Sequence, residues 1–228
     1  MPERMRFSAR LLPVVALGLA MLLLWLWFGW QPRAPTHRLL DAGSDSPPGG
    51  DFVLQSATGP VGLADFRGKL VLLYFGYTAC PDVCPTNLAL TAMALRELTP
   101  EERARVQALF VSVDPQRDDP GHLKQYVEYF HPDIIGLTDK DARLRALAGR
   151  YGAVYRRSQD SGSAMGYLID HSASTYLIDS AGRLRETLGH ATPSAELVAI
   201  LRRYLADTGA QSTLPAPDTL ENTHVENH

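Results

Sequence analysis

The strongest structural signal in this sequence is Tyr74-Phe75-Gly76-Tyr77-Thr78-Ala79-Cys80-Pro81-Asp82-Val83-Cys84-Pro85-Thr86, which holds both cysteines of the chain. It follows an apolar run over residues 70–75 and precedes a helix-like segment over residues 86–98, so the thiols lie at a predicted strand-to-helix junction. Pro85 suits the first helical position, where a missing N–H removes no hydrogen bond, and this places Cys84 near the N-cap. The unpaired N–H groups and the helix dipole favour a thiolate there, the form that attacks disulfides and binds soft metals.

Length and composition indicate one globular domain with additional segments. The chain has 228 residues, of which 45% are hydrophobic and 21% are charged, as is ordinary for a folded protein. Without the first ten residues, 19 basic and 24 acidic residues remain, a net charge of −5. This acidic balance argues against nucleic acid as a partner. Two cysteines are too few for a scaffold built on disulfides, so the fold must be stabilised by its own core. The close spacing of the two cysteines indicates a single site.

The N-terminus has the pattern of a membrane anchor. Residues 11–30 carry no charge, and as a helix they would be about 30 Å long, which matches the core of a bilayer. The basic tip over residues 1–10 predicts that the N-terminus lies in the cytoplasm and the rest of the chain outside it. A cleaved signal peptide is the alternative. We favour an uncleaved anchor, because the apolar run is long and no A-x-A-like site follows it before Gln31.

Beyond the anchor, the sequence divides into a linker, a domain and a tail. Residues 31–50 are rich in proline and glycine and predict a flexible linker. Residues 51–208 form the predicted domain, and the polar residues 209–228 predict a disordered tail. Strands are expected over residues 52–54, 61–63, 69–75, 106–113, 134–137, 153–157, 167–169, 174–178 and 184–187, and helices over residues 86–98, 123–130, 144–151 and from 193 onward.

Strands that alternate with helices predict an α/β layer with a central sheet. A thiol pair after the first long strand is where thioredoxin-like folds have their reactive site. Two features differ from ordinary thioredoxins, which have two residues between the cysteines and a proline beside the site. Here three residues separate the cysteines, and no proline occurs between Pro132 and Pro193. We therefore do not expect ordinary thioredoxin activity.

The two thiols also form the beginning of a metal site. Two thiolates suit Cu(I) and would accept Zn(II), but two ligands are rarely enough. His171 is the best third candidate, because it lies between two late strands, where the missing proline would be. A lone histidine is more often a surface or core residue, but the expected sheet order brings this one to Cys80 and Cys84. Asp82 and Asp114 could tune the site through hydrogen bonds to the ligands, or could serve only the turns in which they lie.

Three motifs occur in order along the domain: Gly76-Tyr77-Thr78-x-Cys80-Pro81-Asp82-Val83-Cys84-Pro85, Val111-Ser112-Val113-Asp114-Pro115-x-Arg117-Asp118 and Tyr167-x-x-Asp170-His171-Ser172. With them, the chain from about residue 52 to residue 204 resembles the Sco/SenC family, membrane-tethered copper proteins needed to assemble cytochrome c oxidase. The resemblance implies a thioredoxin-like fold and one copper ion, Cu(I) and/or Cu(II), held by Cys80, Cys84 and His171.

The resemblance also implies partners and a location. Copper would be delivered to the dinuclear copper site of cytochrome c oxidase subunit II, or the cysteines of that site would be reduced beforehand. Other periplasmic copper carriers and thiol reductants would be further partners. The short basic N-terminus does not look like a mitochondrial transit peptide. We therefore expect a single-pass protein of a bacterial inner membrane, with its C-terminal domain in the periplasm.

Four functions compete for the two cysteines. The leading hypothesis is a copper metallochaperone, which is not an enzyme. The second is a thiol–disulfide reductase that uses Cys80 and Cys84 as a redox pair and does not need His171. The third is a peroxidase related to the peroxiredoxins, although Thr78 and Cys80 miss the Thr-x-x-Cys motif by one position. The fourth is a structural disulfide, and thiols at a helix N-terminus with a proline on both sides argue against it.

Overall fold

The computed structural model describes residues 17–25, 38–39, 47–158 and 166–212. The chain divides into two compact units, Met1–Pro35 and Thr36–His228. In the first unit, residues 17–25 form an exposed helix, and the remainder of the predicted 11–30 anchor and the 1–10 tip lie outside the described residues. Among the residues that are described, no helix is both long enough and apolar enough to cross a membrane.

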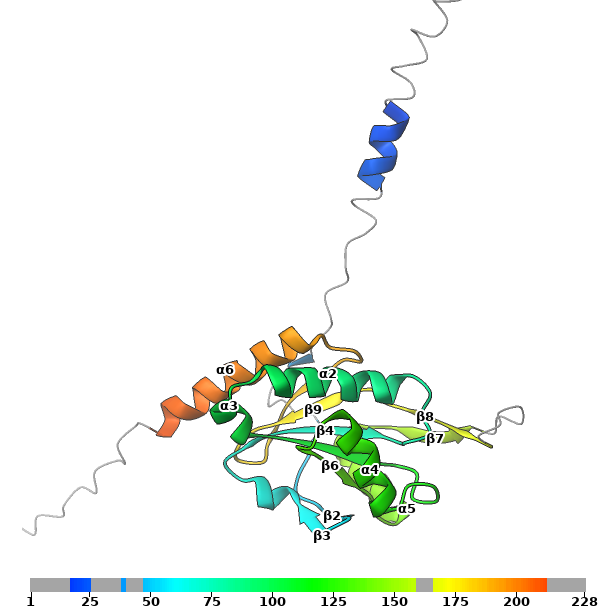
Figure 1. Cartoon of the computed structure of the whole chain (residues 1–228), viewed down its shortest axis with the longest axis vertical. Helices are drawn as coiled ribbons and strands as arrows, with labels where there is room; N and C mark the ends of the chain where they lie inside the picture. Colours follow the sequence, from blue (N-terminus) through cyan, green and yellow to red (C-terminus); the bar gives the residue numbers. More distant parts are fainter. Residues whose placement is uncertain (1–16, 26–37, 40–46, 159–165, 213–228) are drawn as a thin grey trace, which may run out of the picture. The chain divides into compact units, whose positions relative to one another are not determined.

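The second unit is built around a mixed six-stranded sheet (Figure 1). Its strands lie in the order β1 (Arg38–Leu39), β10 (Leu184–Leu188), β9 (Thr175–Ile178), β4 (Leu70–Gly76), β5 (Val106–Ser112) and β6 (Ile134–Leu137). Strands β4, β5 and β6 are parallel, whereas β9 pairs antiparallel with β4 and with β10. All seven residues of β4 are buried, as expected for a strand covered on both faces. The predicted thioredoxin-like α/β fold with a central sheet is confirmed.

Helices cover both faces of this sheet. They are α2 (Val83–Glu97), α3 (Pro100–Ala104), α4 (Pro120–Phe130), α5 (Asp141–Arg150) and α6 (Ser194–Ser212), with a short 3-10 turn, η1, at Leu63–Phe66. Helix α2 contacts both α4 and α6, and Figure 1 shows α2 and α6 side by side over the sheet. The side chains of β4 alternate between the two faces. Tyr74 stacks on Phe110 on the face of α4, whereas Phe75 packs on Tyr151 at the end of α5.

Two antiparallel hairpins stand beside the sheet. The first joins β2 (Val53–Ser56) to β3 (Gly59–Gly62), and an isolated bridge between Gln55 and Thr138 ties it to the sheet beyond β6. The second joins β7 (Tyr155–Ser158) to β8 (Leu168–His171). In the described part of the chain, this second hairpin pairs with no strand of the central sheet. Since His171 ends β8, one predicted metal ligand lies outside the sheet that carries the cysteines.

Within residues 31–50, predicted to form a flexible linker, the structure describes residues 38–39 and 47–50. Strand β1 pairs antiparallel with β10, so it belongs to the sheet. The Gly49 N–H donates to the carbonyl of Arg150 at 2.8 Å, and the Tyr151 hydroxyl donates to the carbonyl of Gly50 at 2.9 Å. Proline and glycine content predicted flexibility, but these backbone groups have partners in the domain. At the other end, α6 continues into the predicted tail as far as Ser212, because a formed helix gains one hydrogen bond per added residue; residues 213–228 lie outside the described residues.

Candidate metal centre

The parallel pairing of β4 and β5 brings two loops together at one edge of the sheet. Gly76, the last residue of β4, is level with Ser112, the last residue of β5. The loop that contains Cys80 leaves the sheet at the first point, and the turn that contains Asp114 leaves it at the second. The site is therefore assembled at the carboxyl ends of the strands, where open α/β sheets place their ligands.

Helix α2 begins earlier than the sequence predicted. Its N-cap is Asp82 and its first residue is Val83, so Pro85 is the third helical residue and Cys84 the second. The first-turn N–H groups of a helix have no intrahelical partner, so proline is tolerated at this position as well. The Cys84 N–H points at the Sγ of Cys80, with an N–S distance of 3.5 Å.

Three predicted ligands converge at this point. The Sγ atoms of Cys80 and Cys84 and a ring nitrogen of His171 all lie within 4.8 Å of one another. The Sγ of Cys84 is 3.3 Å from Nε2 of His171. Both cysteines are free and buried, whereas His171 is half-buried. Two sulfurs and one imidazole nitrogen form a donor set that a soft, thiophilic metal ion fits.

The two thiols have opposite electrostatic environments. A hydrogen bond from the Cys84 thiol, followed by contributions from His171 and the backbone N–H groups of Asp82 and Cys84, lowers the pKa of Cys80 to about 3 against the opposing effect of burial. The same hydrogen bond and its own burial raise the pKa of Cys84. The hydrogen bond from the Cys84 N–H to the Sγ of Cys80 therefore favours the thiolate at Cys80 rather than at Cys84, where the sequence predicted it. The free N–H groups at the start of α2 are directed at the cysteine that precedes the helix, not at the cysteine inside it.

The imidazole of His171 is held in a defined orientation. Its Nδ1 lies 3.1 Å from the carbonyl oxygen of Ser172, and a proton donated there leaves the lone pair of Nε2 directed at the thiols. The rings of Tyr74 and Tyr77 meet the imidazole edge-on, at interplanar angles of 79° and 84°. Aromatic neighbours on two sides restrict rotation of the ring.

The site leaves no space at Gly76. A Cβ on this residue would lie 2.7 Å from Cε2 of Phe110 and 2.8 Å from the Sγ of Cys84. Tyr74 closes the same region, and its hydroxyl donates to the Sγ of Cys84 at 3.8 Å. The glycine before the cysteine loop is therefore required by the closeness of a metal ligand.

The sequence reasoning gave no role to two residues that support the site, Asn87 and Asp118, although Asp118 lies in the second motif. Asn87, buried on α2, donates from Nδ2 to the carbonyl of Ala173 at 3.1 Å and accepts from the Ala191 N–H at 2.9 Å. Asp118, fully buried, accepts from the backbone N–H and the hydroxyl of Thr78 at 2.9 and 2.6 Å, and so anchors the cysteine loop. A polar residue on the buried face of a helix was the available signal for Asn87.

The two aspartates singled out in the sequence differ in their surroundings. Asp82 is exposed and contributes its backbone N–H, not its carboxylate, to Cys80. Asp114 is fully buried, and its carboxylate contacts Arg117, Tyr167 and Arg157. Asp114 therefore contacts the β7–β8 hairpin, which carries His171, and not the predicted ligands themselves.

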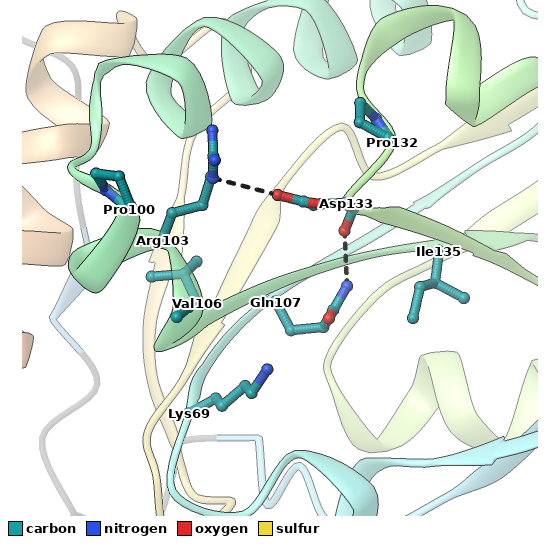
Figure 2. Close-up of a pocket in the computed structure, with 9 residues that line it drawn as sticks. Lys69, Pro100, Arg103, Val106, Gln107, Pro132, Asp133 and Ile135 are labelled. Carbon is teal, nitrogen blue, oxygen red and sulfur yellow. Dashed lines mark hydrogen bonds and ion pairs between the residues drawn. The ribbon is translucent and has the colours of Figure 1, made fainter.

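A separate hollow lies at the opposite ends of the strands. Figure 2 shows it between Lys69, which precedes β4, and Asp133, which precedes β6. Its volume is about 440 Å³, Arg103 pairs with Asp133 at 3.4 Å, and the Gln107 amide donates to the Asp133 carbonyl at 2.7 Å. Neither thiol nor imidazole is among its described lining residues, so it is not part of the metal centre.

Comparison with known proteins gives a consistent result. The SCO1/SenC family model matches residues 41–206. A mitochondrial SCO2 homologue of Mus musculus is 35% identical over 191 residues, which cover 80% of this chain and 73% of that protein. The apo Sco1 protein of Thermus thermophilus is 38% identical, with a TM-score of 0.63 over 75% of this chain and 99% of that one. The copper-bound ScoI of Bradyrhizobium japonicum is 35% identical, with a TM-score of 0.62 over 69% and 99% of the two chains.

Proposed function

The chain belongs to the SCO1/SenC family, and on this premise we propose that it is a copper metallochaperone that supplies the dinuclear copper site of cytochrome c oxidase subunit II. The observation that carries the proposal is the convergence of Cys80, Cys84 and His171 within 4.8 Å. A homologous structure holds copper, which supports the choice of metal. One such group in the described residues corresponds to one copper ion per chain.

The donor set explains how this chain would hold copper. Cys80 needs little further deprotonation, because its pKa is already lowered, whereas Cys84 must lose its proton when the metal binds. Cys80 is 8% exposed and Cys84 is 0% exposed, while His171 is half-buried. A partner would therefore approach from the imidazole side, where one ligand can be exchanged while the buried thiols retain the metal.

The proposal is tested by titrating the reduced full-length protein with Cu(I), without oxygen, against a competing chelator. Wild-type protein is expected to bind one tight equivalent, and His171→Ala is expected to bind at least tenfold more weakly, because loss of one of three ligands leaves a two-coordinate site. His190→Ala, which removes an exposed histidine after β10, is the matched control. Equal affinity in His171→Ala and wild-type protein would refute the three-ligand site.

The membrane location is part of the same proposal. Its support is the uncharged run over residues 11–30 and the arginines before it. The domain would then lie in the periplasm of a bacterium, on the side where subunit II exposes its copper site. Protease treatment of spheroplasts is expected to digest the domain. Full protection of the domain from protease would contradict this orientation.

A thiol–disulfide reductase is the second candidate, and the lowered pKa of Cys80 favours it. The Cys80 thiolate would attack one sulfur of a partner disulfide, and the other sulfur would leave as a thiolate. Cys84 would then displace the remaining partner thiol and close a Cys80–Cys84 disulfide, so that two electrons pass to the partner. Thiol release from an oxidised subunit II peptide, without copper, tests this. A reductase retains its rate in His171→Ala and loses it in Cys80→Ser.

A further inference from the structure

The metal centre is assembled from two separately anchored parts. Cys80 and Cys84 lie in the loop and helix that follow β4, whereas His171 ends the β7–β8 hairpin. This hairpin has no strand partner among the described strands of the central sheet. The distance between the imidazole and the thiols therefore depends on side-chain contacts that hold the hairpin to the body of the domain.

The strongest of these contacts converge on the carboxylate of Asp114, in the turn after β5. Tyr167, next to β8, donates its hydroxyl to Oδ1 of Asp114 at 2.7 Å. Arg157, from β7, lies 3.9 Å from the same oxygen, and Arg117 donates from Nε to Oδ2. Asp114 has 0% exposure, so solvent screens these contacts little.

The ring of Tyr167 is enclosed by the same two arginines. The guanidinium carbon of Arg117 lies 3.8 Å from the centre of the ring, and that of Arg157 lies 4.1 Å from it. Arg117 also donates from Nη1 to the carbonyl of Tyr167 at 3.1 Å. One buried carboxylate thus orders two cations, and both cations lie against the ring.

A shorter path leads from this cluster to His171. The backbone N–H of Ile169, two residues before His171, points into the domain and donates to the hydroxyl of Tyr77 at 3.2 Å. Tyr77 lies in the cysteine loop, its ring meets the imidazole edge-on, and the guanidinium of Arg117 lies 5.6 Å from the centre of that ring. Strand β8 is therefore held just before its start by Asp114 through Tyr167, and at its second residue by Tyr77.

We propose that Asp114, Arg117 and Tyr167 form a latch that positions His171 against the two thiols by holding the β7–β8 hairpin to the end of β5. These are positioning residues, since none of them touches the ligand atoms. When the latch opens, His171 moves away from the thiols while Cys80 and Cys84 remain in place. The loss of His171 as a copper ligand rests on the proposed function. The placement of the hairpin by the latch does not depend on it.

The test uses Tyr167→Phe in the full-length protein. Asp114→Asn would leave two arginines without their carboxylate and could prevent folding. Tyr167→Phe keeps the ring against the two arginines and removes only the hydroxyl. Amide hydrogen exchange is measured without metal, at Ile169 on the hairpin and at Leu72 in β4. A hydrogen bond to a charged group corresponds to roughly a ten- to hundredfold change, so exchange at Ile169 should accelerate by about that factor while Leu72 is unchanged. Tyr129→Phe, at an 85% exposed tyrosine of α4, is the matched control and should leave both amides unchanged.

Copper binding is the second measurement, and each combination of outcomes either supports or overturns the latch. The Cu(I) affinity of Tyr167→Phe should fall toward that of His171→Ala. Unchanged exchange at Ile169 would overturn the latch, as would equal acceleration at Leu72, which indicates global destabilisation. Faster exchange at Ile169 with wild-type copper affinity would also overturn it, because His171 would then be positioned without the latch. If wild-type protein binds no copper but Ile169 responds as expected, the latch stands and the proposed function fails.

Discussion

A methyl group added at Gly76, the last residue of β4 before the cysteine loop, should disturb the metal centre. The Cβ of Gly76→Ala would lie 2.7 Å from Cε2 of Phe110, 2.8 Å from the Sγ of Cys84 and 3.1 Å from Cε1 of Tyr74. Favourable contacts between carbon atoms lie at about 3.5–4.0 Å, so the first overlap is about 1 Å. Phe110 and Cys84 both have 0% exposure, so neither can move into solvent.

The magnitude follows from this overlap. Overpacking of a buried site costs about 1–3 kcal/mol, which for a chain of this size lowers Tm by about 2–12 °C. Alanine restricts the unfolded chain more than glycine does, which offsets about 0.4–1 kcal/mol of the loss. Since the overlap is with a sulfur ligand, the Cu(I) affinity should also fall, by about 10- to 100-fold, as for other residues that hold ligands in place.

The assay is thermal unfolding of the full-length protein together with the Cu(I) titration. Gly149→Ala is the matched control, because Gly149 lies in α5 and a Cβ there would meet nothing within 4 Å. Alanine in a helix is favoured over glycine by up to about 1 kcal/mol, so this variant should be at least as stable as wild type with unchanged copper affinity. A Gly76→Ala protein with the Tm and the copper affinity of wild type would refute the reasoning.

Three further predictions concern the supporting residues. Asn87→Ala leaves the Ala191 N–H and the Ala173 carbonyl, both half-buried, without this partner, so the free energy of unfolding in urea should fall by about 1–3 kcal/mol; an unchanged urea midpoint would contradict this. Asp118→Asn removes the charge that Thr78 donates to, and it should lower both stability and copper affinity, whereas a loss confined to stability would show that the loop does not need this anchor. Burial lowers the pKa of His131, so the folded state favours its neutral form; the stability is present above the ordinary pKa of about 6.5 and is lost as the pH falls below it. The urea midpoint should therefore drop between pH 7 and pH 5, and His131→Gln should drop less if the buried imidazole is the cause.

The local part of the site could be read from the sequence. Cys80 and Cys84 are four residues apart, between an apolar strand and the helix that follows it. A connection this short keeps the two thiols close to each other in space. His171 could be placed from the predicted order of the strands, since residues at the ends of neighbouring strands meet at one edge of a sheet. The end of β8 does lie at the thiols, but β8 pairs with no described strand of the central sheet, so His171 reaches them from the separate hairpin and not from a neighbouring strand.

The identity of the thiolate could not be predicted in the same way. It depends on whether α2 starts before or after Cys84, a difference of two or three residues, and helix ends are defined poorly by a pattern of apolar positions. The same shift changes which sulfur receives the free N–H groups. The contacts of Gly49 and Gly50 could not be predicted for a related reason. Proline and glycine content indicates how freely a segment can bend, but not whether these residues find hydrogen-bond partners at Arg150 and Tyr151.

What the sequence by itself determined was the α/β order of elements, the thiol pair and the family resemblance. These depend on spacing along the chain and on the periodicity of apolar residues, which are local properties. Only the tertiary structure decided which thiol is ionised, why Gly76 carries no side chain, and that Asp114 contacts Tyr167 rather than the ligands. These properties depend on distances between residues far apart in the sequence, such as the 53 positions that separate Asp114 from Tyr167, and such distances are set only when the sheet, the helices and the hairpin pack together.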